Sequence, residues 1–403
     1  MKLIITFLIN FLLPYFAVAQ FGCTDPLANN FDPLAQINNG SCTYSSTNYQ
    51  PNLVADLTQN LNENSALIYW GNQIVTLNDG GNEAALFFLN NNGTVLRKVI
   101  VDQANNVDWE ALTQDNNNIY IGDFGNNYGN RNNLCVYKIS KIDISNSIND
   151  TVSAIKMNFV YGNQANFSSA LNANNFDCEA FFYHMDSLHL FTKDWLDLKT
   201  RHYVLPSHWL DTVNAVQIDS FLIDGLITDA TIDSSSNHAM LLGYKNNGNN
   251  IYTSFIWILS DYSEHHYFSG NKRRIEIGNM FNLSQTEGIT LIDSTQGYIS
   301  SEQISSVITI PAKLFQFNFQ NYFFQNGANT PKLENEKKPL FYPNPADDKL
   351  YFSNILDAIK VISLDGKVII DLQVAEEFID IRNLDPGIYF LQGNGKIEKL
   401  EVY

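Results

Sequence analysis

The sequence is poor in several residue types that define common protein classes. Its 403 residues include only four cysteines and 11 prolines, and 24 Lys and Arg residues face 42 Asp and Glu residues, for a formal net charge of −18. The scarcity of basic residues argues against binding to nucleic acid or to an anionic membrane surface, because both need positive patches. The negative charge permits divalent cations or neutral ligands such as glycans, and it is also common in soluble exported proteins.

Familiar catalytic motifs are missing as well. The chain has no Gly-x-Ser-x-Gly, His-Glu-x-x-His or P-loop pattern. No cysteine or cysteine–histidine spacing indicates zinc. The seven histidines avoid the repeated motif described below, and we expect the adjacent pair His265 and His266 at the surface. The sequence therefore leaves open whether the protein is an enzyme.

Long apolar runs are confined to the N-terminus. Residues 1–19 combine one lysine, an apolar stretch and the small-residue end Ala17-Val18-Ala19, which predicts a secretory signal cleaved before Gln20. No later segment approaches the roughly 18 consecutive apolar residues of a membrane-spanning helix. We expect the mature chain to be exported and to contain no membrane span.

The cysteines fall into two pairs of different character. Cys23 and Cys42 enclose a polar segment, residues 21–44, that is too small for a hydrophobic core, and we expect them to form a disulfide. Such a bridge would contribute about 3 kcal/mol. Cys135 and Cys178 lie in apolar, strand-like runs, a pattern that favours buried thiols over a second bridge.

Segment 21–44 reads FGCTDPLANNFDPLAQINNGSCTY. It resembles the short Gly-Cys-Thr-Asp-Pro modules at the ends of many exported bacterial proteins. Related calcium-rich repeats carry acids at several of these positions. Here Asp25 and Asp32 are present, but Asn38 and Asn39 stand where acids often occur. Because amide ligands bring less charge to a hard cation, the pattern favours a stapled cap or spacer over a calcium site.

Residues 50–325 contain a repeated pair of short strands separated by a polar turn. Copies of this pair occupy residues 64–82, 106–127, 175–195, 226–247 and 285–303. The copies belong to repeats of roughly 45–70 residues that each hold about four strands, and such repeats predict an all-β propeller with five or six four-stranded blades. The copies resemble exported bacterial propeller proteins with Asp-Trp-Glu and Gly-Asp-x-Gly-Asn motifs, a resemblance that implies the fold and no particular activity.

Acidic residues recur at matching places in these copies. In an antiparallel pair, the start of the first strand and the end of the second lie at the same edge. Strand alternation also lets Trp109 pack between blades while Asp108 and Glu110 face the channel. The sequence therefore predicts a ring of carboxylates at one end of the channel: Asp79, Asp108, Glu110, Asp123, Asp177, Glu179, Asp194, Asp229, Glu287 and Glu302.

Two explanations of this ring remain open. In the first, the acids accept backbone N–H bonds from the neighbouring blade and lock the blades together. In the second they hold a ligand or cation, because clustered carboxylates repel one another unless something neutralises them. Calcium is the hard cation that this hypothesis predicts, and the candidate ligands are Asp108, Glu110, Asp177 and Glu179.

The C-terminal part has a different composition. Residues 326–340 are polar and charged and predict a linker, and residues 341–403 predict a small immunoglobulin-like β-sandwich. The latter resembles the type A sorting domain of type IX secretion substrates. The resemblance rests on YPNP at 342–345, IKVISLDGKVI at 359–369 and LDPGIYFLQ at 384–392, and its motif residues here are Pro343, Asn344, Pro345, Gly366, Gly387 and Tyr389. It implies export by the type IX machinery to the cell surface or the medium.

These observations support one main functional hypothesis and one alternative. The main hypothesis is an exported β-propeller that binds a glycan or protein ligand at the cell surface. The alternative is a calcium-supported hydrolase of the lactonase, esterase or glycosidase kind that acts at the propeller mouth.

Overall fold

The computed structural model divides the chain into two compact units, residues 1–324 and 325–403. It describes residues 20–248, 251–305, 309–323, 341–342, 346, 348–352, 359–364, 366–372, 378–393 and 396–402. The predicted signal at 1–19, the predicted linker at 326–340 and the motif residues Pro343, Asn344 and Pro345 lie outside this described part.

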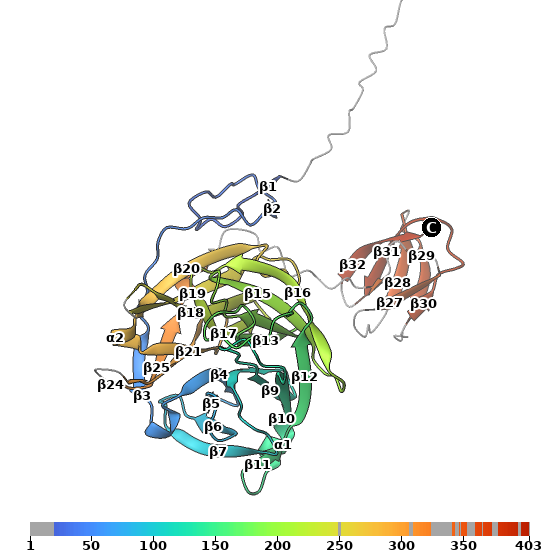
Figure 1. The fold of residues 1–403 in the computed structure, drawn as a ribbon. Helices are drawn as coiled ribbons and strands as arrows, with labels where there is room; N and C mark the ends of the chain where they lie inside the picture. Colours follow the sequence, from blue (N-terminus) through green and yellow to red (C-terminus); the bar gives the residue numbers. More distant parts are fainter. Residues whose placement is uncertain are drawn as a thin grey trace, which may run out of the picture. The chain divides into compact units, whose positions relative to one another are not determined.

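The first unit is a five-bladed β-propeller (Figure 1). The innermost strands of the blades are β4 (Asn64–Trp70), β8 (Trp109–Gln114), β13 (Cys178–His184), β17 (Leu226–Asp233) and β21 (Gln285–Leu291). Each innermost strand contacts the next around the axis, and β21 contacts β4, so the ring closes. The repeated strand pairs found in the sequence are the two inner strands of these blades.

Three further strands complete each blade. The second strands are β5 (Gln73–Asn78), β9 (Asn118–Asp123), β14 (Ser187–Thr192), β18 (His238–Asn246) and β22 (Gln296–Glu302). The third strands are β6 (Ala85–Leu89), β10 (Cys135–Ser140), β15 (Lys199–Pro206), β19 (Tyr252–Ser260) and β25 (Lys313–Asn318). The outer strands are β7 (Val95–Asp102), β12 (Ile155–Tyr161), β16 (Val213–Leu222), β20 (Asn271–Asn279) and β3 (Asn52–Asp56).

The fifth blade is closed by a strand from the start of the domain. Its order is β21-β22-β25-β3, and β3 pairs antiparallel with β25 with Ala55 opposite Leu314. The two ends of the propeller sequence thus share one sheet. This pairing holds the ring closed by backbone hydrogen bonds.

Additional strand pairings and short helices lie at the edges of the blades and in the loops between strands. The second and third blades are joined where β12 pairs in parallel with β16, and β11 (Thr151–Ser153) pairs in parallel with β7. These additions cover sheet edges that would otherwise expose unpaired backbone groups. The remaining short elements are α1 (Lys141–Asn146), α2 (Met280–Leu283), β23 (Ile304–Ser305), β24 (Thr309–Ile310) and the 3₁₀ turns Gln59–Leu61 and Gln320–Tyr322.

The hydrophobic core is divided among the spaces between blades. Trp109 is fully buried and packs with Ala66 and Leu77 of the first blade, as the alternation in Asp108-Trp109-Glu110 predicts. Cys135 and Cys178 are free and buried in these layers, which confirms the prediction of thiols. The core lies between the blades, so the residues at the ends of the inner strands line the two mouths of the channel.

The N-terminal module is a small stapled loop. Its strands β1 (Phe21–Gly22) and β2 (Ile37–Asn38) pair in parallel, and the predicted Cys23–Cys42 disulfide is present. The Asn38 amide donates to the carboxylate of Asp261 at 2.8 Å, which fastens the module to the fourth blade. Asp25 accepts hydrogen bonds from the Tyr44 hydroxyl (2.6 Å) and the Leu27 N–H (2.9 Å), a role in the turn itself.

The second unit contains two small sheets. One has the order β26 (Phe341–Tyr342), β27 (Lys349–Phe352), β30 (Phe378–Asp380), and the other β29 (Val368–Leu372), β28 (Ile359–Ser363), β31 (Gly387–Gly393), β32 (Lys396–Val402). Their buried side chains include Leu350 and Leu391. Gly366 has a φ of 84° in the turn between β28 and β29, a conformation that favours glycine. Gly387 begins β31, and the Tyr389 hydroxyl donates to the C=O of Asp385 (2.8 Å).

Candidate functional site

Each innermost strand carries a one-residue β-bulge near its start. The bulged residues are Ser65, Glu110, Glu179, Thr228 and Glu287. A bulge interrupts strand alternation and redirects the extra side chain. All five bulges lie at one end of the channel, because the five strands are equivalent around the axis. Ser65 and the three glutamates line a cavity of about 270 Å³ there.

A second set of side chains comes from the ends of the second strands. Asp79 and Lys193 directly follow β5 and β14, Tyr244 lies near the end of β18, and Glu302 ends β22. All four line the same cavity. The acidic cavity, as we call it, is therefore built from two stacked rings of positions, one from the bulges and one from the second strands.

Three carboxylates converge beside the acidic cavity, and two of them, Asp79 and Glu110, line it. Asp79, Asp108 and Glu110 each offer an oxygen, and these oxygens lie within 4.8 Å of one another. Glycine stands at Gly80 and Gly125, where a Cβ would collide with the carboxylates of Asp108 and Glu110. The backbone therefore approaches these oxygens closely at both glycines, of which Gly125 belongs to the Gly-Asp-x-Gly motif at 122–125.

The cavity carboxylates receive few hydrogen bonds from the protein. Glu179 accepts from the Lys193 ammonium, and Glu287 accepts from the Gln285 amide at 2.5 Å. Ser65 Oγ lies 3.3 Å from Glu110 Oε2. Within the described part of the chain, no hydrogen bond reaches the side chain of Glu302. These oxygens thus retain lone pairs for another partner.

Burial changes the protonation of these groups. It raises the pKa of the cavity carboxyls, to about 6 for Asp79, about 7 for Asp108 and Glu287, about 9 for Glu302, and well above the usual range for Glu110 and Glu179. Lys193 is the one cation among the described residues that line the cavity. Burial opposes its charge, but Glu179 and its neighbours outweigh that effect and raise its pKa. The site therefore favours added positive charge, either as protons or as a cation.

Other acids of the predicted ring accept hydrogen bonds from groups of the protein itself. Asp177 accepts the Asn126 N–H (2.6 Å) and the Trp195 indole N–H (2.8 Å), which ties the second blade to the third. Asp229 accepts the N–H groups of Ala230 (2.8 Å) and Ile289 (2.7 Å), which ties the fourth blade to the fifth. Neither side chain lines the acidic cavity.

Asp123 and Asp194 are held by arginines. Asp123 accepts from Arg131 Nη2 (2.7 Å) and from the Asp108 N–H (3.1 Å). Asp194 pairs with Arg201. The predicted ring therefore divides into two groups. The cavity acids are Asp79, Glu110, Glu179, Glu287 and Glu302, which line the acidic cavity, together with Asp108, which lies beside Asp79 and Glu110. The bonded acids are Asp123, Asp177, Asp194 and Asp229. In the predicted cation set, Asp177 belongs with the bonded acids and Asp79 lies beside Asp108 and Glu110.

The opposite end of the channel is different. Its cavity of about 950 Å³ is lined by the far ends of the innermost strands and the turns after them. Thr113, Tyr183, His184 and Thr290 are among its lining residues. The Tyr183 ring stacks on Tyr120 with centroids 6.1 Å apart. We call this space the far cavity.

Comparison with known proteins identifies the C-terminal unit. Residues 340–401 match the family described as the secretion system C-terminal sorting domain. The sorting domain indicates export, handling by the type IX secretion machinery, and a cell-surface or secreted location. Along the described residues, no helix is long and apolar enough to cross a membrane. The class defined so far is thus an exported β-propeller protein with a sorting domain.

No curated protein matches the chain, and the following solved structures resemble it distantly. A Coprinopsis cinerea GH62 α-L-arabinofuranosidase catalytic domain is 10% identical, with a TM-score of 0.41 over 68% of this chain and 98% of its own. PorZ, a surface component of the type IX secretion system of Porphyromonas gingivalis, is 11% identical, with a TM-score of 0.29 over 84% of this chain and 51% of its own. Similarity at this level carries no functional argument.

Proposed function

We propose that the protein is an exported binding protein whose acidic cavity holds a calcium ion, through which the propeller engages a glycan or protein ligand. The observation that carries this proposal is the convergence of Asp79, Asp108 and Glu110 within 4.8 Å beside glycine backbone. Calcium takes six to eight oxygen ligands. Three carboxylates leave coordination positions for oxygens of water or of a bound partner.

The charge of the cavity supports a cation over a neutral ligand. The cavity acids face Lys193, and Arg131 lies 3.8 Å from Asp108. The bonded acids, in contrast, have protein donors of their own. A calcium ion would lower the pKa of the cavity carboxyls by binding their charged form. It would thereby replace protons that burial otherwise retains.

The test is thermal unfolding of the secreted protein in millimolar calcium and in chelator. A ligand that binds the folded state alone adds about 2.7 kcal/mol at a hundredfold excess over its Kd. We expect a higher Tm in calcium, loss of most of that gain in Glu110→Gln, and no loss in Asp186→Asn, which removes a carboxylate at the far cavity. Identical melting of the wild type with calcium and chelator, with no heat of binding by calorimetry, would contradict the proposal.

Export is tested separately from binding. A chain that lacks residues 341–403 should accumulate in the periplasm, because the sorting domain is the feature that addresses it to the secretion machinery. Immunoblots of periplasm, cell surface and medium measure the distribution. Normal surface or medium levels of the truncated chain would contradict a sorting role for the second unit.

A hydrolase remains the second candidate, for one specific reason. Asp108 and Glu287 have pKa values raised to about 7, so each could give or take a proton near neutral pH. Assays on lactone, ester and glycoside substrates would detect activity. Turnover that disappears in Glu287→Gln while calcium binding persists would favour catalysis over binding alone.

A further inference from the structure

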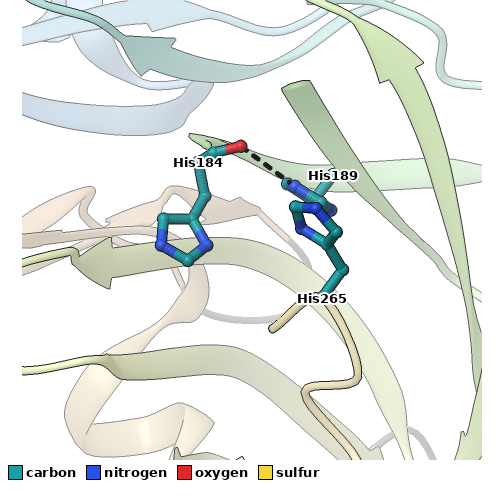
Figure 2. A group of neighbouring side chains, drawn as sticks. All are labelled: His184, His189 and His265. Atoms are coloured by element: carbon teal, nitrogen blue, oxygen red, sulfur yellow. Dashed lines mark hydrogen bonds between the residues drawn. The ribbon is translucent and has the colours of Figure 1, made fainter. Parts of the chain in front are cut away.

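Three histidines meet between the third and fourth blades (Figure 2). His184 ends β13, His189 lies in β14, and His265 lies in the loop between β19 and β20. Each offers one ring nitrogen, and these nitrogens lie within 4.8 Å of one another. His184 also lines the far cavity, so the cluster lies behind the wall of that cavity, at the opposite end of the channel from the acids.

A hydrogen-bonded chain leads into the cluster from outside. Asp219 Oδ1 lies 3.3 Å from Nδ1 of His202, and Nε2 of His202 lies 2.9 Å from Nδ1 of His189. Both imidazoles are fully buried. Carboxylate-to-histidine contacts of this kind orient metal-binding imidazoles in proteins and fix which nitrogen carries the proton.

Counting protons along this chain leaves one unfilled contact. If His202 donates through Nδ1 to Asp219 and His189 donates through Nδ1 to His202, the other nitrogen of His189 has no proton. That nitrogen, Nε2, lies 3.2 Å from the C=O of His184, which is also an acceptor. Two neutral imidazoles supply two protons for three contacts, so in one contact two lone pairs face each other, and in this tautomer that contact is the one at His189 Nε2. A cation at this point would bind the free nitrogen.

The other two rings are also poised as ligands. Nδ1 of His265 is buried and has no hydrogen-bond partner within the described part of the structure. The rings of His265 and His189 stack with centroids 5.0 Å apart. The Tyr267 hydroxyl lies 2.7 Å from Nδ1 of His184 and holds that ring in place. A buried polar atom without a partner is costly unless something binds it.

We propose that His184, His189 and His265 form a binding site for a divalent transition metal of the zinc class. Neutral imidazole is the ligand that zinc, copper and nickel share. Three histidines leave a coordination position open, the arrangement of zinc sites that bind a water or an exogenous ligand. His202, Asp219 and Tyr267 are positioning residues. Tetrahedral zinc takes Zn–N distances of about 2.0–2.1 Å, and the three ring nitrogens lie within 4.8 Å of one another.

The first test is metal binding by the whole secreted protein, prepared without a polyhistidine tag and freed of metal by chelator. Zinc is titrated against a chromophoric chelator, and cobalt is added separately as a spectroscopic probe. We expect one zinc per chain, and ligand-field absorption of tetrahedral cobalt. Zinc X-ray absorption should show imidazole scattering with Zn–N near 2.0–2.1 Å.

Variants then assign the site. His265→Gln should weaken zinc binding at least about 100-fold, and Asp219→Asn about 10–100-fold, as outer-shell changes commonly do. His208→Gln removes an exposed imidazole elsewhere and should leave the affinity unchanged. Circular dichroism confirms that each variant is folded. The absorption measurements on wild type need no variant, so they still test the site if His265→Gln fails to fold.

Two results would overturn the proposal. One is a wild-type protein that binds no zinc in the micromolar range. The other is a folded His265→Gln variant that binds zinc as the wild type does. The calcium proposal fails or stands independently, because Glu110→Gln should leave zinc affinity unchanged and His265→Gln should leave the calcium-induced rise in Tm unchanged.

Discussion

The two ends of the channel are made by the same five strands, yet they present different chemistry. At the end where the innermost strands begin, each strand carries a bulge. Four of the five bulged side chains, Ser65 and three glutamates, line the acidic cavity. At the far end, the strands pair without bulges, and hydroxyl, aromatic and histidine side chains line the larger cavity. One backbone irregularity, repeated by symmetry, thus separates an acidic site from a mainly uncharged one.

Within the acidic end, two acids that are both buried have different environments. Asp229 and Glu179 are both buried carboxylates near the start of an innermost strand. Asp229 lies one residue past its bulge, where two backbone N–H groups reach it. Glu179 is the bulged residue itself and faces Lys193 in the cavity. A shift of one residue therefore separates a structural acid from a candidate ligand.

The largest expected effect comes from a bonded acid. Asp229→Ala leaves the N–H groups of Ala230 and Ile289 buried without an acceptor, and we expect a loss of roughly 2–5 kcal/mol in the free energy of unfolding. Calorimetry of the propeller transition measures it. Glu302→Gln, at the same end of the channel, is the control and should cause no loss. Equal destabilisation by both substitutions would erase the division between bonded and cavity acids.

Replacing a cavity acid should instead raise the free energy of unfolding, by an amount that depends on pH. The pKa of Glu302 is raised to about 9, so the folded protein holds a proton that the unfolded chain releases above pH ~4. Because the folded state binds more protons, its stability falls as pH rises toward 9. At about 1.4 kcal/mol per pKa unit, the roughly 3.5 pH units between pH ~4.5 and pH 8 set an upper bound of about 5 kcal/mol. Because Glu302 is partly exposed and solvent screens its charge, we expect Glu302→Gln in chelator at pH 8 to add roughly 1–3 kcal/mol.

The same Glu302→Gln variant provides its own control at low pH. Near pH 4 both states of the wild type are protonated at Glu302, so the gain should vanish. Urea unfolding curves at the two pH values give the comparison. A gain of the same size at pH 4 and pH 8 would show that packing, rather than charge, is responsible.

The smallest effect is expected at the far end. Asp186 is exposed in the turn after β13, with a φ of 59° that asparagine also tolerates. Asp186→Asn should change stability by less than about 0.5 kcal/mol, as exposed substitutions usually do. Its Tm should also respond to calcium as the wild type does. A large change in either quantity would mean that carboxylates at both ends are coupled through the channel.

Much of the fold could be predicted from the sequence. The alternation and turn residues of 106–127 and its copies identified the two inner strands of every blade, and the motifs of 341–403 identified the sorting domain. Within the site, strict alternation placed Trp109 correctly between blades but did not reveal the bulge at Glu110. The repeated acids do not point to Ser65 or Gln285, although an alignment of the copies on the bulged position brings both into the same columns as the cavity acids.

The sequence predicts the environment of the histidines less well than that of the acids. His265 and His266 were expected together at the surface, and His266 is exposed, but the Nδ1 atom of His265 is buried beside His189. Nothing in the local pattern distinguishes the two. Their environments differ because the loop between β19 and β20 folds against a neighbouring blade, and sequence spacing does not encode that contact.

By itself, the sequence determined the strands, the turns, the stapled module and the address for export, because these depend on local alternation, turn chemistry and short motifs. Only the tertiary structure decided which acids bond to backbone and which face the acidic cavity, that β3 closes the fifth blade, and that three histidines meet. These features depend on register and on contacts between distant segments. A one-residue bulge changes the direction of a side chain without changing the pattern of the chain.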